Sequence, residues 1–248
     1  MKTLGIIGVG VFGEFMLRHV APYFAVRVHD PHRDLAELAE VYNVAPSTLA
    51  DCAACDIVIL AVPVQIMEQV AGGIAGMLRP GTLVIDVASV KLRPAEILQR
   101  VLPAHVDIVC THPLFGPQSG QKGIADLKIT VCEIRGGRAT HVADFLRRRL
   151  LLEVIETTPE QHDRELAYVQ GLTHLIGKIL LDLDLEKIRQ TTASFELVMQ
   201  AVGFIRHDSD ELFKAIEQEN PYVSEAHERF FRTAQKLEAD LAASRLKD

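Results

Sequence analysis

Short apolar runs alternate with amphipathic segments through the first part of the chain. The runs are continuously hydrophobic, as is typical of strands buried on both faces of a parallel sheet. Strands are predicted at Leu4–Ile7, Ala25–His29, Ile57–Val62, Leu83–Val87, Asp107–Cys110, Ile129–Cys132 and Leu152–Thr157. Helices are predicted between them at Phe12–Val20, Leu35–Tyr42, Val64–Met77, Pro94–Val101 and Arg138–Leu150. This order predicts an α/β fold, a doubly wound Rossmann domain around a parallel sheet.

The strand pattern ends after Pro159, and helical periods follow. Helices are expected at about 160–183, 187–205, 209–219 and 222–245, so we predict a Rossmann domain over 1–158 and an all-α domain over 159–248. In the first of these helices the apolar residues share one face. The opposite face carries Asp163, Ala167, Gln170 and His174, a pattern that by itself is typical of a solvated surface.

Composition narrows the class of protein. Of 248 residues, 48% are hydrophobic, and the net charge of −7 argues against a nucleic-acid partner. The basic run Arg147–Arg149 fits the solvated end of a helix. No apolar run approaches the roughly 20 residues of a membrane-spanning helix. Because the N-terminus also shows no secretory signal, we expect a cytoplasmic protein without a membrane partner.

Cysteine spacing gives no sign of a metal site. Cys52 and Cys55 form a lone C-x-x-C without the additional ligands that zinc requires, and Cys110 and Cys132 lie in apolar strands. We therefore interpret all four as structural residues.

A glycine motif predicts a dinucleotide site. Gly8, Gly10 and Gly13 form G-x-G-x-x-G between a predicted strand and a predicted helix, and Asp30 ends the next strand. The helix N-terminus can bind a diphosphate, and a carboxylate at this spacing can accept hydrogen bonds from the ribose. Because Asp30 would repel a 2′-phosphate, we expect NAD to be preferred over NADP. The nearby cation Arg33 could weaken this repulsion. The other cofactor-binding candidates are Val11, Phe12, Val62 and Pro63.

Two loops at the same expected sheet edge carry candidate chemistry. Asp86-Val87-Ala88-Ser89-Val90-Lys91 follows one strand, and His112 ends another before a loop with two prolines and two glycines. A histidine can accept a proton near neutral pH. Taken alone, His112 could equally be a structural core histidine, and Ser89 could simply begin a helix.

Three motifs together resemble the prephenate/arogenate dehydrogenase family of tyrosine biosynthesis. They are the 86–91 run, the run Thr111–Gly120, and His162-Asp163 with His174 further along. The likeness covers the whole chain and is strongest to plant-type arogenate dehydrogenases.

The resemblance implies oxidative decarboxylation of a cyclohexadienol, with NAD as hydride acceptor. His112 would be the general base on the ring hydroxyl, and Ser89 would hydrogen-bond His112 or the same hydroxyl. His174 and Gln170 would reach the substrate side chain, so they are expected to line a cleft. The remaining substrate-binding candidates are Lys91, Gln118, Ser119 and Asp163. A homodimer formed through the helical domain is also implied.

One departure from the family bears on the substrate. Prephenate-specific bacterial members carry arginines on a helix of the second domain, whereas residues 191–198 here contain Glu196 and no arginine. Glu196 or Asp163 could meet the ammonium group of arogenate, so arogenate is favoured over prephenate.

Two other interpretations remain. A β-hydroxyacid dehydrogenase would use a second-domain lysine, for which Lys178 is the candidate. An inactive NAD-binding regulatory protein would need the glycine motif and Asp30, but neither Ser89 nor His112.

Overall fold

The computed structural model describes residues 1–185, 188–206 and 208–245 and divides into two compact units, 1–162 and 163–248. The division between His162 and Asp163 lies close to the predicted boundary at 158. Each unit is described by itself below.

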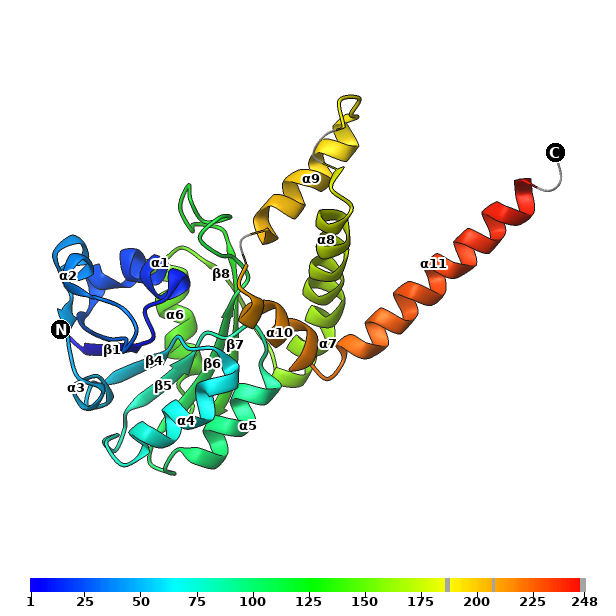
Figure 1. Ribbon diagram of the computed structural model, residues 1–248. Coiled ribbons are helices and arrows are strands. Elements are labelled where there is room, and N and C mark those ends of the chain that lie inside the picture. Colours follow the sequence, from blue (N-terminus) through cyan, green and yellow to red (C-terminus); the bar gives the residue numbers. More distant parts are fainter. Residues whose placement is uncertain (186–187, 207, 246–248) are drawn as a thin grey trace. The chain divides into compact units, whose positions relative to one another are not determined.

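The first unit is built on an eight-stranded sheet with the order β3-β2-β1-β4-β5-β6-β7-β8 (Figure 1). The strands are β1 Thr3–Ile7, β2 Ala25–His29, β3 Ala45–Pro46, β4 Ile57–Leu60, β5 Leu83–Asp86, β6 Asp107–Pro113, β7 Lys128–Arg135 and β8 Glu153–Glu156. Its helices are α1 Val11–Val20, the 3-10 turn Ala21–Tyr23, α2 Ala36–Tyr42, α3 Leu49–Ala53, α4 Val64–Ala75, α5 Leu92–Val101 and α6 Ala139–Arg149. The doubly wound Rossmann prediction is confirmed.

Successive residues of each strand face opposite sides of the sheet and separate two cores. Val58, Val84 and Ile108 pack on the side of α4 and α5. Leu83, Val109 and Val131 pack on the opposite side, with α1 and α6. Both faces of the central strands are therefore covered, which explains why their sequences are continuously apolar.

The sheet is mostly parallel, as predicted, and departs from the parallel arrangement at one pair. From β3 to β6 all neighbours are parallel, but β6 and β7 run antiparallel, with Cys110 opposite Cys132 and His112 opposite Thr130. A parallel return requires a crossover, usually a helix, and residues 114–127 contain none. This connecting loop therefore starts and ends at the sheet edge where β1, β4 and β5 end.

The second unit is all-α, as predicted. Its helices are α7 Pro159–Leu166, which starts in the first unit, the π-helical turn Ala167–Gly171, α8 Leu172–Asp182, α9 Ala193–Ile205, α10 Asp210–Gln218 and α11 Val223–Arg245. The predicted start of a helix at Lys187 lies outside the described residues.

The polar face predicted for the 163–183 helix is not a solvated surface. Asp163, Ala167 and His174 of that face are buried, whereas Val169 and Leu183 of the apolar face are exposed. Small residues contribute to this burial, because they allow neighbouring helices to approach closely. A Cβ on Gly171 would lie 3.1 Å from a methyl of Val223 in α11, and one on Gly177 would collide with Ile205 in α9.

A similar close approach in the first unit gives a test of the fold. A Cβ on Gly5 of β1 would lie 2.2 Å from the backbone oxygen of Cys52 in α3, so Gly5→Ala must push helix and strand apart. We expect it to lower the free energy of unfolding by about 3 kcal/mol. Gly76 is the control, because a Cβ there meets no atom within 4 Å and Gly76→Ala should change stability by less than about 0.5 kcal/mol. Chemical denaturation followed by circular dichroism measures both; equal midpoints would contradict the close packing.

Candidate functional site

The predicted motifs meet at the edge where the parallel strands end. Ile7 pairs with Leu60, Leu60 with Asp86, and Asp86 with Cys110. The loops that follow these strands therefore start side by side. They carry the glycine motif, Val62 and Pro63, the 87–91 run, and His112 with its loop, as predicted from the sequence.

Each of the three positions in the motif requires a glycine for a different physical reason. Gly8 has a φ of +93°, and a Cβ there would lie 2.4 Å from the oxygen of Ala61. A Cβ on Gly13 would lie 2.6 Å from the oxygen of Gly8, so this residue keeps α1 close to β1. Gly10 has no atom within 4 Å of its Cβ position. Packing of the chain does not require a glycine at Gly10, whereas close approach of a diphosphate to its backbone does.

Asp30 is fixed beside this turn. Its Oδ2 accepts a hydrogen bond of 2.7 Å from the Val9 amide, and its Oδ1 accepts one of 2.9 Å from the His32 amide. Arg33 donates to the Val9 oxygen at 2.8 Å and pairs with Glu14 at 2.5 Å. The carboxylate is thus held where a ribose would lie in this fold, and the nearby guanidinium is already engaged by an acid.

Two further cofactor candidates begin α1 beside Gly10. Val11 is 76% exposed although it is a large apolar residue, and Phe12 is partly buried. This exposed apolar surface lies next to the open Gly10 position, where a bound dinucleotide would cover it.

His112 lies near the end of β6, is buried, and contacts a second histidine. Its Nδ1 is 2.9 Å from Nε2 of His162, and the rings meet edge to face. Burial, followed by the charges of His162 and Lys91, holds the pKa of His112 well below its usual value of 6.5. Within the described chain His112 Nε2 has no hydrogen-bond partner. The arrangement provides a neutral imidazole with one nitrogen engaged and the other available.

No hydrogen bond joins Ser89 to His112 within the described residues, and Nδ1 of His112 faces His162. The alternative, a contact of Ser89 with the substrate hydroxyl, stays a prediction. Sequence reasoning quoted His162 in a motif but assigned it no role. The motif His162-Asp163 was the only sign in the sequence that His162 has a function. A single sequence does not show which two histidines contact each other in the fold.

Lys91 requires a correction. It was predicted to bind substrate, but its side chain is fully buried and its ammonium contacts Asp86 Oδ1 at 2.6 Å and the Thr111 oxygen at 2.5 Å. The Thr111 hydroxyl in turn donates to the Asp86 oxygen at 2.7 Å. Lys91 therefore joins the end of β5 to the end of β6 directly before His112.

The other loop candidates lie after β6. Gln118 is partly buried, and the Ser119 hydroxyl accepts a 3.0 Å hydrogen bond from the Gly116 amide. Ser119 thereby stabilises the turn that follows His112.

The second unit contains a separate polar cluster. His174 Nδ1 lies 2.9 Å from the Gln170 oxygen and its Nε2 lies 3.0 Å from Asp208 Oδ2. Both ring nitrogens therefore lie within hydrogen-bond distance of oxygens of the same unit. Burial raises the pKa of nearby Glu217 to about 7 and lowers that of His227, which is 2.9 Å from it. His174 is thus engaged within its own unit, and the prediction that it contacts substrate stays a prediction.

The acidic candidates for a substrate ammonium differ in exposure. Asp163 is fully buried, so its carboxylate would have to be uncovered to meet a ligand. Glu196 is exposed near the start of α9 and accepts a hydrogen bond from the Thr191 hydroxyl at 2.7 Å.

All four cysteines are free and buried. Burial raises the pKa of the Cys52 thiol to about 12 and raises those of Cys55 and Cys110. Among the described residues no group of histidine, cysteine and acidic side chains is arranged to hold a metal ion. The described helices include none long and apolar enough to cross a membrane.

Comparison with known proteins agrees with this geometry. Residues 23–127 match the family model described as prephenate dehydrogenase, nucleotide-binding domain, and residues 158–247 match its dimerization domain. The chain belongs to the prephenate/arogenate dehydrogenase family.

One similar relative is arogenate dehydrogenase 1, chloroplastic, of Arabidopsis thaliana, which is 30% identical over 96% of this chain. The match covers 39% of that relative, so the chain spans about two-fifths of its length. The fold resembles prephenate dehydrogenase of Aquifex aeolicus in complex with hydroxyphenyl propionate and NAD+ (TM-score 0.78, 18% identity, 98% of this chain and 92% of that one). It also resembles Synechocystis arogenate dehydrogenase (TM-score 0.73, 15% identity, 98% and 93%).

The open space at Gly10 yields a prediction that separates folding from cofactor binding. Gly10→Ala should leave the melting temperature unchanged, because its φ of −69° suits any residue and its Cβ meets no atom. It should weaken NAD binding by about tenfold or more, because the methyl group occupies the approach to the diphosphate. Calorimetric titration with NAD measures the affinity. Unchanged affinity would place the diphosphate elsewhere.

Proposed function

We propose that the protein is an NAD-dependent arogenate or prephenate dehydrogenase that carries out oxidative decarboxylation of a cyclohexadienol. The observation that supports this most directly is the buried His112, engaged through Nδ1 by His162, at the sheet edge that carries the glycine motif. A nucleotide-binding regulator would not need this pair.

His112 acts as general base through Nε2. Bound NAD supplies the acceptor for the hydride that leaves C4 of the substrate ring. The C4 hydroxyl proton passes to His112 Nε2, and the ring carboxylate then leaves as carbon dioxide while the ring becomes aromatic. This assignment requires His112 to carry its hydrogen on Nδ1 and donate it to His162 Nε2, because the reverse tautomer would have no lone pair facing the substrate.

The surroundings of His112 keep it in the basic form. Burial, and after it the neighbouring His162 and the Lys91 ammonium, lower its pKa, so the ring keeps its neutral form to lower pH than an ordinary histidine does. The ion pair of Lys91 with Asp86 also fixes Thr111, the residue before the base. Ser89, partly buried on the neighbouring loop, is assigned to the substrate hydroxyl.

Arogenate is the favoured substrate. Residues 191–198 offer Glu196 and no arginine, which suits an ammonium group better than an additional carboxylate. His174, Gln170 and Gln118 stay assigned to the substrate side of the site, with prephenate as the alternative substrate.

NAD is the favoured cofactor. Asp30 would face the ribose hydroxyls and repel a 2′-phosphate. Arg33, the nearby cation that could compensate, is paired with Glu14. This pairing supports NAD more strongly than the spacing alone.

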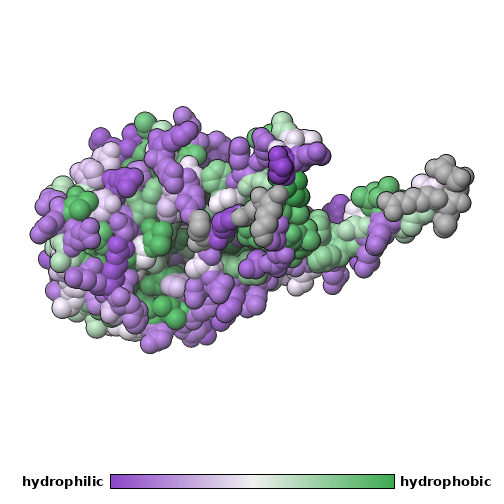
Figure 2. Space-filling view, turned by 45° about the horizontal axis from the view of Figure 1, so that its top comes forward, coloured by the Kyte–Doolittle hydropathy of each residue, from purple (hydrophilic) through white to green (hydrophobic). Residues whose placement is uncertain are grey.

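A homodimer through the second unit is the proposed assembly. Large apolar side chains stay exposed on the described helices there, including Val169, Leu183, Leu197 and Phe204. Figure 2 shows apolar patches interrupting a mostly hydrophilic surface, with some on α11. Sedimentation equilibrium tests for the dimer, and a monomer at micromolar concentration would contradict it.

The expected cytoplasmic location stays a prediction.

The substrate and cofactor assignments are tested together by measuring kcat/KM for arogenate and prephenate, each with NAD and NADP. We expect arogenate with NAD to give the highest value. Faster turnover of prephenate would show that Glu196 does not select for an ammonium group.

A further test concerns the cofactor. Glu14→Gln should release Arg33 and raise the NADP/NAD ratio of kcat/KM several-fold. An unchanged ratio would show that Glu14 does not keep Arg33 from binding a 2′-phosphate.

The histidine pair gives the second functional test. His112→Asn should lower kcat by about 10²–10⁴ with a smaller change in KM. In the wild type the acid limb of kcat/KM against pH should lie below pH 6.5, because a base with a lowered pKa loses its activity only at lower pH.

His162→Leu should lower kcat by about 10–100-fold, since Nδ1 loses its acceptor, and His162→Gln should recover part of the rate through its side-chain oxygen. Both variants should move the acid limb, because the pKa of His112 depends on its contact with His162. A loss of rate with an unmoved limb would leave His162 a purely structural role.

A further inference from the structure

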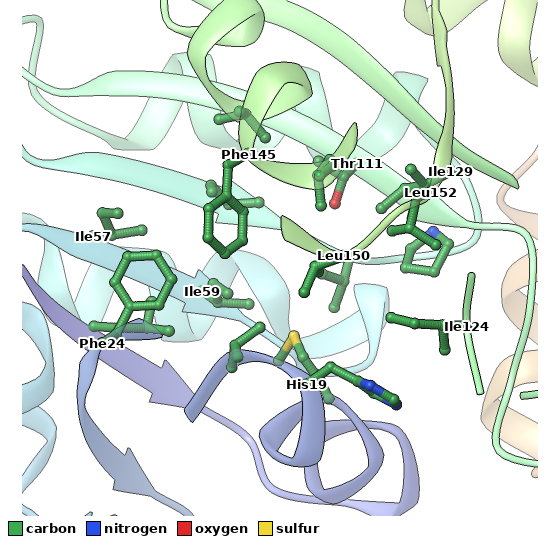
Figure 3. Close-up of a pocket in the computed structure, with 18 of the residues that line it drawn as sticks. His19, Phe24, Ile57, Ile59, Thr111, Ile124, Ile129, Phe145, Leu150 and Leu152 are labelled. Atoms are coloured by element: carbon green, nitrogen blue, oxygen red, sulfur yellow. The ribbon is translucent and has the colours of Figure 1, made fainter. Parts of the chain in front are cut away.

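An apolar cavity of about 280 Å³ lies within the first unit, between the sheet and helices α1 and α6. Figure 3 shows Phe24, Ile57, Ile59 and Phe145 around one part of it and Thr111, Ile129 and Leu152 around another. An engineered cavity of roughly 150 Å³ already accommodates benzene. Side chains around empty space lose the contacts that a close-packed interior provides, so a cavity of this size favours an apolar occupant.

The ionisable groups around the cavity are all basic. They are Lys2, His19, Arg138 and His141, and no aspartate or glutamate lines the space. Nε2 of His19 and Nε of Arg138 are buried without a hydrogen-bond partner in the described chain, while the outer Nη1 of Arg138 lies 3.6 Å from Asp107 Oδ2. Buried polar atoms without partners are costly. A ligand that brings an acceptor oxygen and a negative charge would satisfy them.

The topology separates the two ends of the cavity. Lys2 precedes β1, and Arg138 precedes α6 directly after β7, whose last residue, Arg135, pairs with Ile108 at the start of β6. These cations therefore lie toward the sheet edge where the parallel strands begin. Val87 and Thr111 line the cavity at the opposite edge, where the nucleotide and His112 loops start.

We propose that this cavity binds an amphipathic monocarboxylate, such as a medium-chain fatty acid. Its apolar tail lies along the sheet beneath α1 and α6, and its carboxylate meets the basic groups that include Arg138. The site lies apart from the three glycines of the motif and from His112 Nε2, although Phe12 of the motif also lines it. Binding to it does not depend on the proposed function.

Occupancy has a route to the catalytic loop. Thr111, the residue directly before His112, lines the cavity. Its backbone oxygen accepts a hydrogen bond from the Lys91 ammonium. Pro113, on the other side of His112, also lines it. A tail that presses on these residues changes the position of the base, a consequence that rests on the proposed function.

The test is calorimetric titration of the full chain with decanoate, below its critical micelle concentration and without substrate. We expect one saturable site per chain. Decanol, which lacks the charge, and decylamine, which reverses it, should each bind at least about tenfold more weakly. Absence of saturable binding, or equal binding of decylamine, would overturn the proposal.

Two variants locate the site. Arg138→Gln should weaken decanoate binding by about tenfold. Its matched control, Arg148→Gln, changes an exposed arginine in the last turn of α6 that does not line the cavity, and should leave binding within about twofold. Val142→Phe fills part of the space and should abolish binding, with folding checked by circular dichroism. Equal affinities of the two glutamine variants would place decanoate elsewhere.

Activity is a separate readout. Saturating decanoate should change kcat for the preferred cyclohexadienol in the wild type and not in Val142→Phe. Binding without a change in kcat would keep the site and remove its coupling to His112. If neither cyclohexadienol is turned over, the proposed function fails while the binding result stands.

Discussion

A fully buried ion pair fixes the geometry around the candidate base. Lys91 and Asp86 are both removed from water, and such a pair must compensate the loss of hydration through close contacts. Here the ammonium contacts a carboxylate at 2.6 Å and a backbone oxygen at 2.5 Å. The pair ties the end of β5, the loop after it and the end of β6 together. Replacing only Lys91 or only Asp86 with a neutral residue would leave a buried, uncompensated charge next to Thr111, the residue before His112.

The antiparallel return of β7 has a comparable influence on the layout. It keeps residues 114–127 at the edge where the parallel strands end, and it sends α6 back over the sheet on the side of α1. The helix-free loop and the cavity between α1 and α6 both follow from this change of strand direction. One topological feature therefore shapes both the candidate catalytic loop and the proposed fatty-acid site.

Local sequence patterns predicted every strand except the short β3, most helices, the glycine motif with Asp30, and the meeting of the Ser89 and His112 loops, because these depend on short-range periodicity and strand order. The antiparallel pairing of β7 is set by the lack of a helix between Pro113 and Lys128. The contact of His112 with His162 joins residues far apart in sequence, and no local pattern specifies it. The hydrophobic pattern alone did not reveal the burial of the polar face of α8, because it does not register glycines that permit close helix contact.

The buried thiols have a practical consequence. Cys52, Cys55, Cys110 and Cys132 are enclosed, and burial raises the pKa of the first three, so little thiolate is exposed to oxidants or alkylating reagents near neutral pH. The natural chain is therefore suited to site-specific labelling. A single cysteine introduced on the surface would react with a fluorophore or spin label ahead of the native residues, and the two units could each carry a probe without first removing any of them.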